Sequence, residues 1–207
     1  MDLVLLACSN RKQSGGVPDY TPSKPLDQAL SPESFEKLMY ARAELVRSTN
    51  KRLPIGPDVG IPGIQAPVEY LPAYQRYTGI VYERGRVQDL YSGQSLIRLV
   101  IISALYGLLD GDDLIQKYDL TMDDKISGQC ANTWWKCHSL GKIVEEYIQF
   151  YNPGSVHDLL PLKYRKALSP WPPPSLYDLV IPYSYPSEGM REALNRRGED
   201  VERLLLS

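Results

Sequence analysis

Long hydrophobic runs are the first thing that this sequence lacks. No stretch of its 207 residues approaches the roughly 18 uninterrupted apolar residues of a membrane-spanning helix. Asp2 follows Met1 directly, without the basic segment with which a signal peptide begins. We therefore expect a cytoplasmic protein that makes no contact with a membrane.

Paired cysteines and clustered histidines are also missing. The three cysteines, Cys8, Cys130 and Cys137, are an odd number without CxxC spacing. This pattern indicates neither a disulfide framework nor a standard zinc site. His138 follows Cys137, but no second ligand stands at metal-binding distance along the chain. We expect no metal and no cofactor.

The sequence also has little net charge and few phenylalanines. Lys and Arg number 23 against 25 Asp and Glu, so any nucleic-acid contact needs a local basic face. The 15 tyrosines outnumber the 2 phenylalanines. Tyrosine carries a polar hydroxyl on an apolar ring, which suits a pocket for a planar ligand. Ring bodies in the core with hydroxyls at the surface remain the simpler explanation for most of them.

The apolar runs that are present predict buried strands separated by helices. The strands are Asp2–Ala7, Leu96–Ser103, Val156–Leu160 and Leu176–Tyr183. Helices are expected over about Ser31–Arg47, Trp134–Phe150 and Glu188 to the end. The order indicates an α/β fold: one domain over residues 1–207, with a mixed or mostly parallel sheet of about four core strands and helices on its faces. Long Pro/Gly-rich loops are expected at Gln13–Pro32 and Leu53–Pro67.

Polar side chains follow each expected strand. Cys8–Lys12 comes after the first, Ser103–Tyr106 after the second, Lys163–Tyr164 after the third and Tyr183–Ser184 after the fourth. Ligands of open α/β sheets bind beyond the carboxyl ends of the strands. We therefore predict a polar pocket at this edge of the sheet.

The chemistry of these residues favours an anionic ligand. Ser9, Arg11 and Lys12, with the backbone N–H groups around them, can hold a phosphate or carboxylate. Cys8 becomes a nucleophile if Lys12 or a helix end lowers its pKa; the alternative is a buried structural cysteine beside a solvated basic turn. Asp113, in the acidic turn Asp110–Asp113, is a candidate general base or the N-cap of a helix that starts at Leu114. The other predicted ligand-binding residues are Arg76, Thr78, Tyr82, Ser103, Tyr106, Gly107, Tyr118, Lys163 and Tyr164.

Several blocks resemble the bacterial YaaA family of peroxide-stress proteins. They are Ala7–Lys12 (ACSNRK), Arg76–Tyr82 (RYTGIVY), Ile102–Met122 (ISALYGLLDGDDLIQKYDLTM) and Val156–Ala167 (VHDLLPLKYRKA). The resemblance implies a nucleic-acid-binding stress protein whose DNA-binding segment would lie near Arg42–Pro67. This chain has a Pro/Gly-rich stretch in much of that segment.

Two main hypotheses about function follow. The first is a nucleic-acid- or nucleobase-associated protein, with Arg42, Arg47, Lys51 and Arg52 among its phosphate contacts. The alternative is an enzyme acting on a nucleobase, nucleoside or nucleotide, as an N-glycosidase or a base-modifying transferase. A third, an interaction module without chemistry, predicts no small-molecule ligand. The sequence leaves the ligand and the oligomeric state open.

Overall fold

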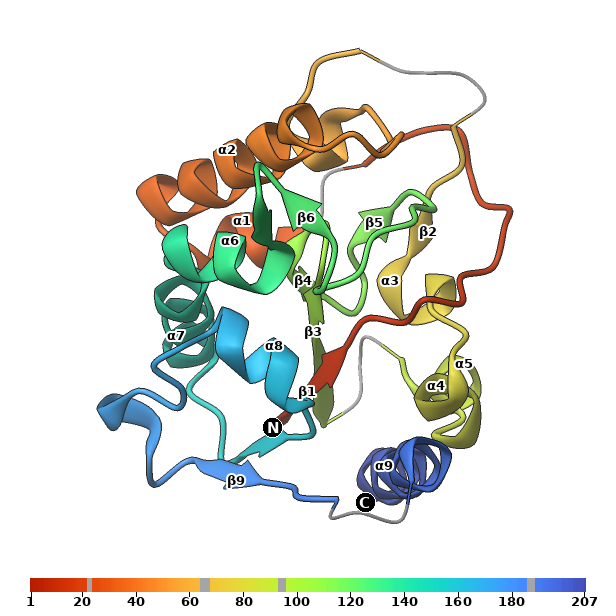
Figure 1. The fold of residues 1–207 in the computed structure, drawn as a ribbon. Coiled ribbons are helices and arrows are strands. Elements are labelled where there is room, and N and C mark those ends of the chain that lie inside the picture. Colours follow the sequence, from red (N-terminus) through yellow and green to blue (C-terminus); the bar gives the residue numbers. More distant parts are fainter. Residues whose placement is uncertain (22–23, 64–67, 93–95, 186–188) are drawn as a thin grey trace.

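A five-stranded sheet forms the centre of the protein. The computed structural model describes residues 1–21, 24–63, 68–92, 96–185 and 189–207 (Figure 1). The strand order in the sheet is β4-β3-β1-β8-β9. The strands are β1 (Asp2–Ala7), β3 (Ile97–Ser103), β4 (Gly107–Asp110), β8 (Val156–Asp158) and β9 (Val180–Pro182). Only the β3–β4 pair of this sheet is antiparallel. The predicted α/β fold with a mostly parallel sheet is confirmed, with one strand more than expected.

The first strand occupies the middle of the sheet because it is apolar on both faces. Leu3 to Leu6 are completely buried, as is typical of a parallel strand covered by helices on both sides. Ala7 is in register with Ile102 of β3, and the N–H of Cys8 donates to the carbonyl of Ile102 at 2.9 Å. The carboxyl ends of β1 and β3 therefore lie level with each other.

Helices cover the sheet on both faces (Figure 1). Helices α6, α7 and α8 lie on one side of β1 and β3, and α4, α5 and α9 lie on the other. None of the helices among the described residues has the length and apolar character of a membrane span. Their bounds are α1 (Lys24–Ala29), α2 (Pro32–Ser48), α3 (Ala73–Arg76), α4 (Ile80–Arg84), α5 (Val87–Leu90), α6 (Ala131–Cys137), α7 (Leu140–Tyr151), α8 (Leu162–Ala167) and α9 (Met190–Leu205).

The minor elements complete the chain. Two pairs of short strands stand apart from the main sheet: β2 (Leu71–Pro72) with β5 (Leu114–Ile115), and β6 (Lys125–Ile126) with β7 (Gln129–Cys130). Single 3₁₀ turns occupy η1 (Pro57–Val59) and η2 (Pro174–Leu176).

The helix expected at Ser31–Arg47 is present as α2. The hydroxyl of Ser31 accepts a hydrogen bond from the N–H of Ser34 at 3.3 Å, and Pro32 occupies the first turn. The single helix expected over Trp134–Phe150 is wrong, because α6 ends before His138 and α7 starts at Leu140. Ser139 between them has φ of 57°, a left-handed conformation that interrupts the helix.

Other expected boundaries differ in part. The Gln13–Pro32 segment is not all loop, because it contains α1. The strand expected at Leu176–Tyr183 is shorter, since its first residue belongs to η2 and only Val180–Pro182 pair with β8. Most of the Leu53–Pro67 segment is irregular as expected; its residues 64–67, and Glu188 at the expected start of the last helix, lie outside the described residues.

The stretch after β3 is a tight hairpin. Ser103 pairs with Gly107, and residues Ala104 to Tyr106 between them are completely buried. Gly107 has φ of +67°, and a β-carbon there would lie 2.7 Å from the ring of Trp135. The indole N–H of Trp135 donates to the carbonyl of Ala104 at 2.8 Å. Trp135 of α6 therefore packs over the hairpin and covers it.

Candidate functional site

A cavity of about 490 Å³ lies beyond the carboxyl end of β1. After β1 the chain first builds β3 on one side and later β8 on the other, and ligands of open α/β sheets bind at such a switch point. The cavity is within the size range of small-molecule sites. It is lined by Ala7, Cys8, Ser9, Asn10, Arg11, Gly79, Ile80, Val81, Tyr82, Pro161, Lys163, Tyr164, Met190, Ala193, Leu194 and Arg197.

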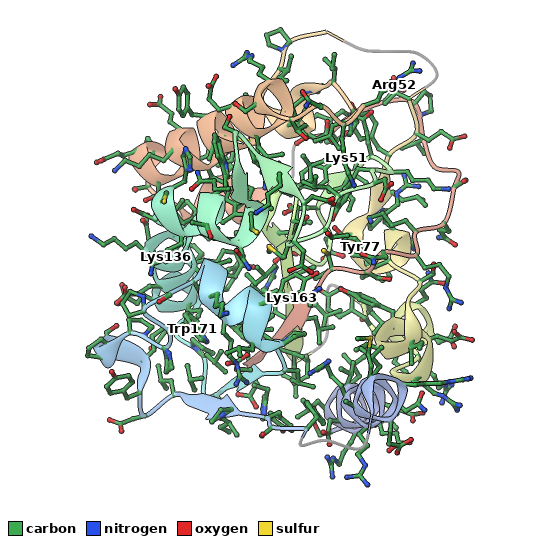
Figure 2. The ribbon with its side chains drawn as sticks, in the orientation of Figure 1. Lys51, Arg52, Tyr77, Lys136, Lys163 and Trp171 are labelled. Carbon is green, nitrogen blue, oxygen red and sulfur yellow. The ribbon has the colours of Figure 1, made fainter. Side chains whose placement is uncertain are left out.

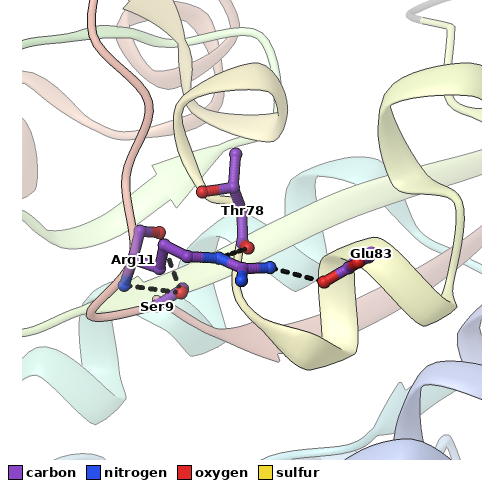
Figure 3. A network of polar contacts seen from close by, with 4 residues as sticks. All are labelled: Ser9, Arg11, Thr78 and Glu83. Carbon is purple, nitrogen blue, oxygen red and sulfur yellow. Dashed lines mark hydrogen bonds and ion pairs between the residues drawn. The ribbon is translucent and has the colours of Figure 1, made fainter.

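One wall of the cavity is the loop after β1, which polar contacts hold in place (Figure 3). The Ser9 hydroxyl accepts from the N–H of Arg11 at 3.1 Å and donates to the carbonyl of Arg11 at 2.9 Å. The Arg11 guanidinium donates to the carbonyl of Thr78 and pairs with Glu83 at 2.5 Å. Thr78 returns a bond from its N–H to the carbonyl of Arg11 at 3.0 Å. The loop is therefore fixed to the segment that leads into α4.

Cys8 lies where this loop meets α8. Its sulfur is 3.4 Å from the phenolic oxygen of Tyr164, and both residues line the cavity. Tyr82 from α4 donates its hydroxyl to the carbonyl of Ala7 at 2.9 Å. Burial raises the pKa of Tyr82 and of Tyr164 well above its ordinary value. Both phenols stay protonated at neutral pH and can donate hydrogen bonds.

Lys12 lies behind the loop and is buried, with only 7% of its surface exposed. Its ammonium is 3.9 Å from the ring centroid of Tyr118 and 5.7 Å from that of Tyr77. Burial is the main reason that the pKa of Lys12 is lowered; the nearby Cys8 acts in the opposite direction. Figure 2 shows Tyr77 and Lys163 at the carboxyl edge of the sheet, with Lys51 and Arg52 farther away.

A chain of hydroxyls connects this lysine to the hairpin. Tyr118 bonds to the Ser103 hydroxyl at 2.8 Å and to the Tyr77 hydroxyl at 2.9 Å. Ser103 also accepts from the N–H of Tyr106 at 3.0 Å. Ser103 and Tyr106 are completely buried, and Gly107 is buried as well. They support the site from beneath and do not line the cavity.

Two arginines that were predicted to contact a ligand or phosphate, Arg76 and Arg42, bind backbone carbonyls of the protein itself. The guanidinium of Arg76 is buried and donates to the carbonyls of Gln13, Glu69 and Ile115. Arg42 is buried too and donates to the carbonyls of Tyr106, Asp58 and Leu108. Each arginine therefore joins distant backbone segments, and neither belongs to the cavity wall.

The structure does not bring Asp113 to Cys8. Because β4 runs antiparallel to β3, its last residue Asp110 pairs with Val100, away from the carboxyl end of β3. Asp113 accepts from the N–H of Asp110 at 2.8 Å and so stabilises the turn after β4. The alternative N-cap role is wrong, because Leu114 starts the short strand β5 and not a helix.

The remaining predicted residues lie at the rim or in the cluster behind it. Lys163 lines the cavity, and its ammonium pairs with Asp123 at 2.9 Å. Tyr118 belongs to the lysine cluster. Within the described ranges, no group of three His, Cys, Asp or Glu side chains is placed to hold a metal ion.

Several residues of the cavity wall are not among the predicted site residues, and Gly79 and Arg197 are the two that matter most for the site. Gly79 lies directly against the Ser9 side chain. Arg197 lies four residues after Ala193 and four before Val201, on the apolar stripe of α9. A charged residue on an apolar stripe is the signal that could have identified it.

Comparison with known proteins points to a single family. The family model described as peroxide stress protein YaaA matches residues 24–183. A UPF0246 protein of Ruegeria sp. is 36% identical over 111 residues, 51% of this chain and 43% of the relative. A UPF0246 protein of Fusobacterium nucleatum is 30% identical over 118 residues, 55% of this chain and 42% of the relative. Each match thus covers less than half the length of the curated relative.

Proposed function

Because the chain belongs to the YaaA peroxide stress protein family, as its match over residues 24–183 shows, we propose that it binds a nucleobase-containing ligand. The ligand is a nucleobase, nucleoside or nucleotide, free or at the end of a nucleic acid. It occupies the cavity beyond β1. The observation that carries this proposal is the meeting of Tyr82, Tyr164 and the polar Cys8–Arg11 loop in one cavity of ligand size.

The composition of the cavity wall supports a base as the bound group. Aromatic side chains bind bases through their faces, at about 1–3 kcal/mol per stacked base. Tyr164 also offers a protonated hydroxyl, and Cys8 and Ser9 add further polar atoms. Apolar walls with a few polar groups are typical of sites that hold small molecules in one orientation.

The basic region at the end of α2 gives less support to a duplex-binding face. Arg42 is buried against backbone carbonyls. Arg47 pairs with Glu44 at 3.0 Å, and Lys51 pairs with Asp124 at 2.8 Å. Phosphate contacts need cations that are free to replace counterions. These pairings favour a small ligand or a strand end over an extended duplex.

Calorimetric titration of the whole chain with bases, nucleosides, nucleotides and short DNA tests this function. We expect at least one nucleobase compound to bind, and Tyr164→Leu to weaken it about tenfold, because the aromatic face is lost. Tyr177→Leu, at an exposed tyrosine, is the control and should bind normally. The proposal is wrong if no such compound binds, or if Tyr164→Leu binds as well as the wild type.

One observation favours an enzyme as the second candidate function. Cys8 combines access to the cavity with a phenol 3.4 Å from its sulfur. In this alternative Cys8 is the nucleophile of an N-glycosidase or a base-modifying transferase. Chromatography after incubation with nucleosides would then detect a released or altered base. Cys8→Ser should abolish the product and the exposed Cys137→Ser should not; absence of any product argues for binding alone.

A further inference from the structure

Arg197 is a buried cation without an acidic partner among the described residues. The residue is 8% exposed, and its guanidinium carbon is 4.6 Å from the ring centroid of Tyr185. Its Nε atom makes no hydrogen bond, and in the described part of the chain its guanidinium forms no ion pair. Buried arginines are usually paired because an uncompensated charge in the interior is costly. This one lies in the wall of the cavity.

The other two cations of the cavity wall differ from Arg197 in this respect. Arg11 pairs with Glu83 and Lys163 pairs with Asp123, and both side chains are about half exposed. They belong to the solvated rim. Arg197 lies among Ala193, Leu194 and Val81, where few polar atoms compete for its donors.

The carboxylate whose charge acts on Arg197, that of Asp158, is already engaged. Both carboxylate oxygens of Asp158 are bound, to Arg165 at 2.8 Å, to the indole N–H of Trp171 at 3.1 Å and to the N–H of Leu160 at 2.9 Å. Burial is the main cause of the lowered pKa of Arg197, and the charge of Arg165 adds to it. The folded protein therefore holds the Arg197 guanidinium where burial and a neighbouring positive charge both disfavour its charged form.

Tight helix packing holds Arg197 in that position. A β-carbon on Gly198 would lie 2.4 Å from the β-carbon of Arg84, and one on Gly85 would lie 2.8 Å from a methyl group of Val201. Helices α9 and α4 therefore contact each other through glycines on both sides. Arg197, next to Gly198, has little freedom to move its backbone out of the cavity wall.

We infer that Arg197 binds an oxyanion group of the ligand, a phosphate monoester or a carboxylate, inside the cavity beyond β1. A guanidinium presents parallel N–H donors that match either group in a bidentate contact. The attraction is stronger in an apolar cavity than in water. The inference rests on the proposed function for the base, and it specifies a nucleoside monophosphate over the neutral nucleoside.

Calorimetric titration of the whole chain tests the inference with matched ligands. The ligands are nucleoside monophosphates, the corresponding nucleosides, inorganic phosphate and acetate. The proteins are the wild type, Arg197→Gln, Arg197→Lys and the control Arg196→Gln, whose residue is exposed on the same helix. The wild type should bind the monophosphate at least tenfold more tightly than the nucleoside.

The variants separate a binding role from a structural one. Arg197→Gln should lose the preference for the monophosphate, Arg197→Lys should retain part of it, and Arg196→Gln should retain all of it. In thermal unfolding without ligand, Arg197→Gln should melt at the same temperature as the wild type or higher, because an unpaired buried charge is removed. A lower melting temperature together with an unchanged preference overturns the inference and assigns Arg197 to structure.

The ligand set also separates the inference from the proposed function. If the wild type binds nucleoside and monophosphate equally, the Arg197 inference is wrong and the nucleobase function stands. If phosphate or acetate binds through Arg197 without any contribution from the base, the inference stands and the nucleobase function is wrong. If none of these compounds binds, both are wrong.

Discussion

A β-carbon built on Gly79 would lie only 2.2 Å from the Oγ atom of Ser9. Gly79 has an ordinary φ of −76°, so close approach and not backbone strain requires the glycine. The contact joins the loop after β1 to the start of α4, which are two walls of the same cavity. It gives the first of four testable predictions.

Gly79→Ala should lower the free energy of unfolding by about 1–3 kcal/mol, because the added methyl group forces Ser9 to move. Ligand affinity should fall too, since Ser9 shapes the loop that lines the cavity. Urea unfolding measures the first effect and calorimetry the second. The double variant Ser9→Gly with Gly79→Ala removes the clash and should recover much of the loss. Simple addition of the two single effects would contradict this account.

Gly198→Ala should separate α9 from α4. The new methyl group meets the β-carbon of Arg84, so we expect a loss of about 1–3 kcal/mol, although alanine is the better helix former by about 1 kcal/mol. The neighbouring exposed Glu199→Ala is the control and should change stability by less than about 0.5 kcal/mol. A stabilised Gly198→Ala protein in urea unfolding would show that the two helices are less tightly packed than described.

Glu146 should make stability depend on pH. Burial raises its pKa, but hydrogen bonds from the Ser34 hydroxyl and the Ser31 N–H outweigh burial and lower it below the ordinary value. A lowered carboxyl pKa stabilises the fold above the unfolded-state pKa, and this contribution disappears as pH falls through the folded-state pKa. Glu146→Gln should therefore cost up to about 1 kcal/mol near pH 7, because solvent screens this partly exposed carboxylate, and the loss should disappear as pH falls through the folded-state pKa.

Urea unfolding across this range of pH measures the effect of Glu146. The control is Glu36→Gln, an exposed glutamate on α2 whose carboxylate makes no hydrogen bond with the described residues. It should change stability little at any pH. A pH-independent loss in Glu146→Gln would mean that packing, and not ionisation, connects α7 to the start of α2.

Lys12→Met should separate stability from binding. The pKa of Lys12 is lowered chiefly by burial, so the unfolded chain holds this proton more tightly than the folded one. Stability therefore rises as pH rises through the folded-state pKa, and below it the ammonium opposes folding. Removing the charge should leave the protein at least as stable at neutral pH while weakening the binding of an anionic ligand. A marked loss of stability would show that the contact with Tyr118 outweighs burial.

The central strands and the loops after them could be predicted because the sequence signal for each lies within the segment itself. Leu3–Ala7 within β1 and Leu99–Ile102 within β3 are continuous apolar runs, and a strand buried on both faces requires such a run. The polar residues that follow Ala7 had to reach the carboxyl edge once that strand was placed. Cys8, Ser9 and Arg11 in the cavity wall follow from this simple geometry.

The other features depend on partners distant in the chain. Nothing near Gly107 in the sequence indicates that Trp135 packs over it, so the hairpin and its buried Tyr106 were missed. Arg76 looked like a ligand contact, yet the carbonyls that it binds come from Gln13, Glu69 and Ile115. A charged side chain can serve a ligand or the backbone, and only the assembled fold distinguishes the two.

The two outer strands of the main sheet have a consequence for solubility. β9 at one edge pairs over only three residues and ends in Pro182, which has no N–H to offer to an added strand. β4 at the other edge extends over only four residues and is completely buried. Long unpaired edges are templates for aggregation through strand addition. The sheet of this protein therefore offers a second copy little edge on which a shared, fibre-forming sheet could grow.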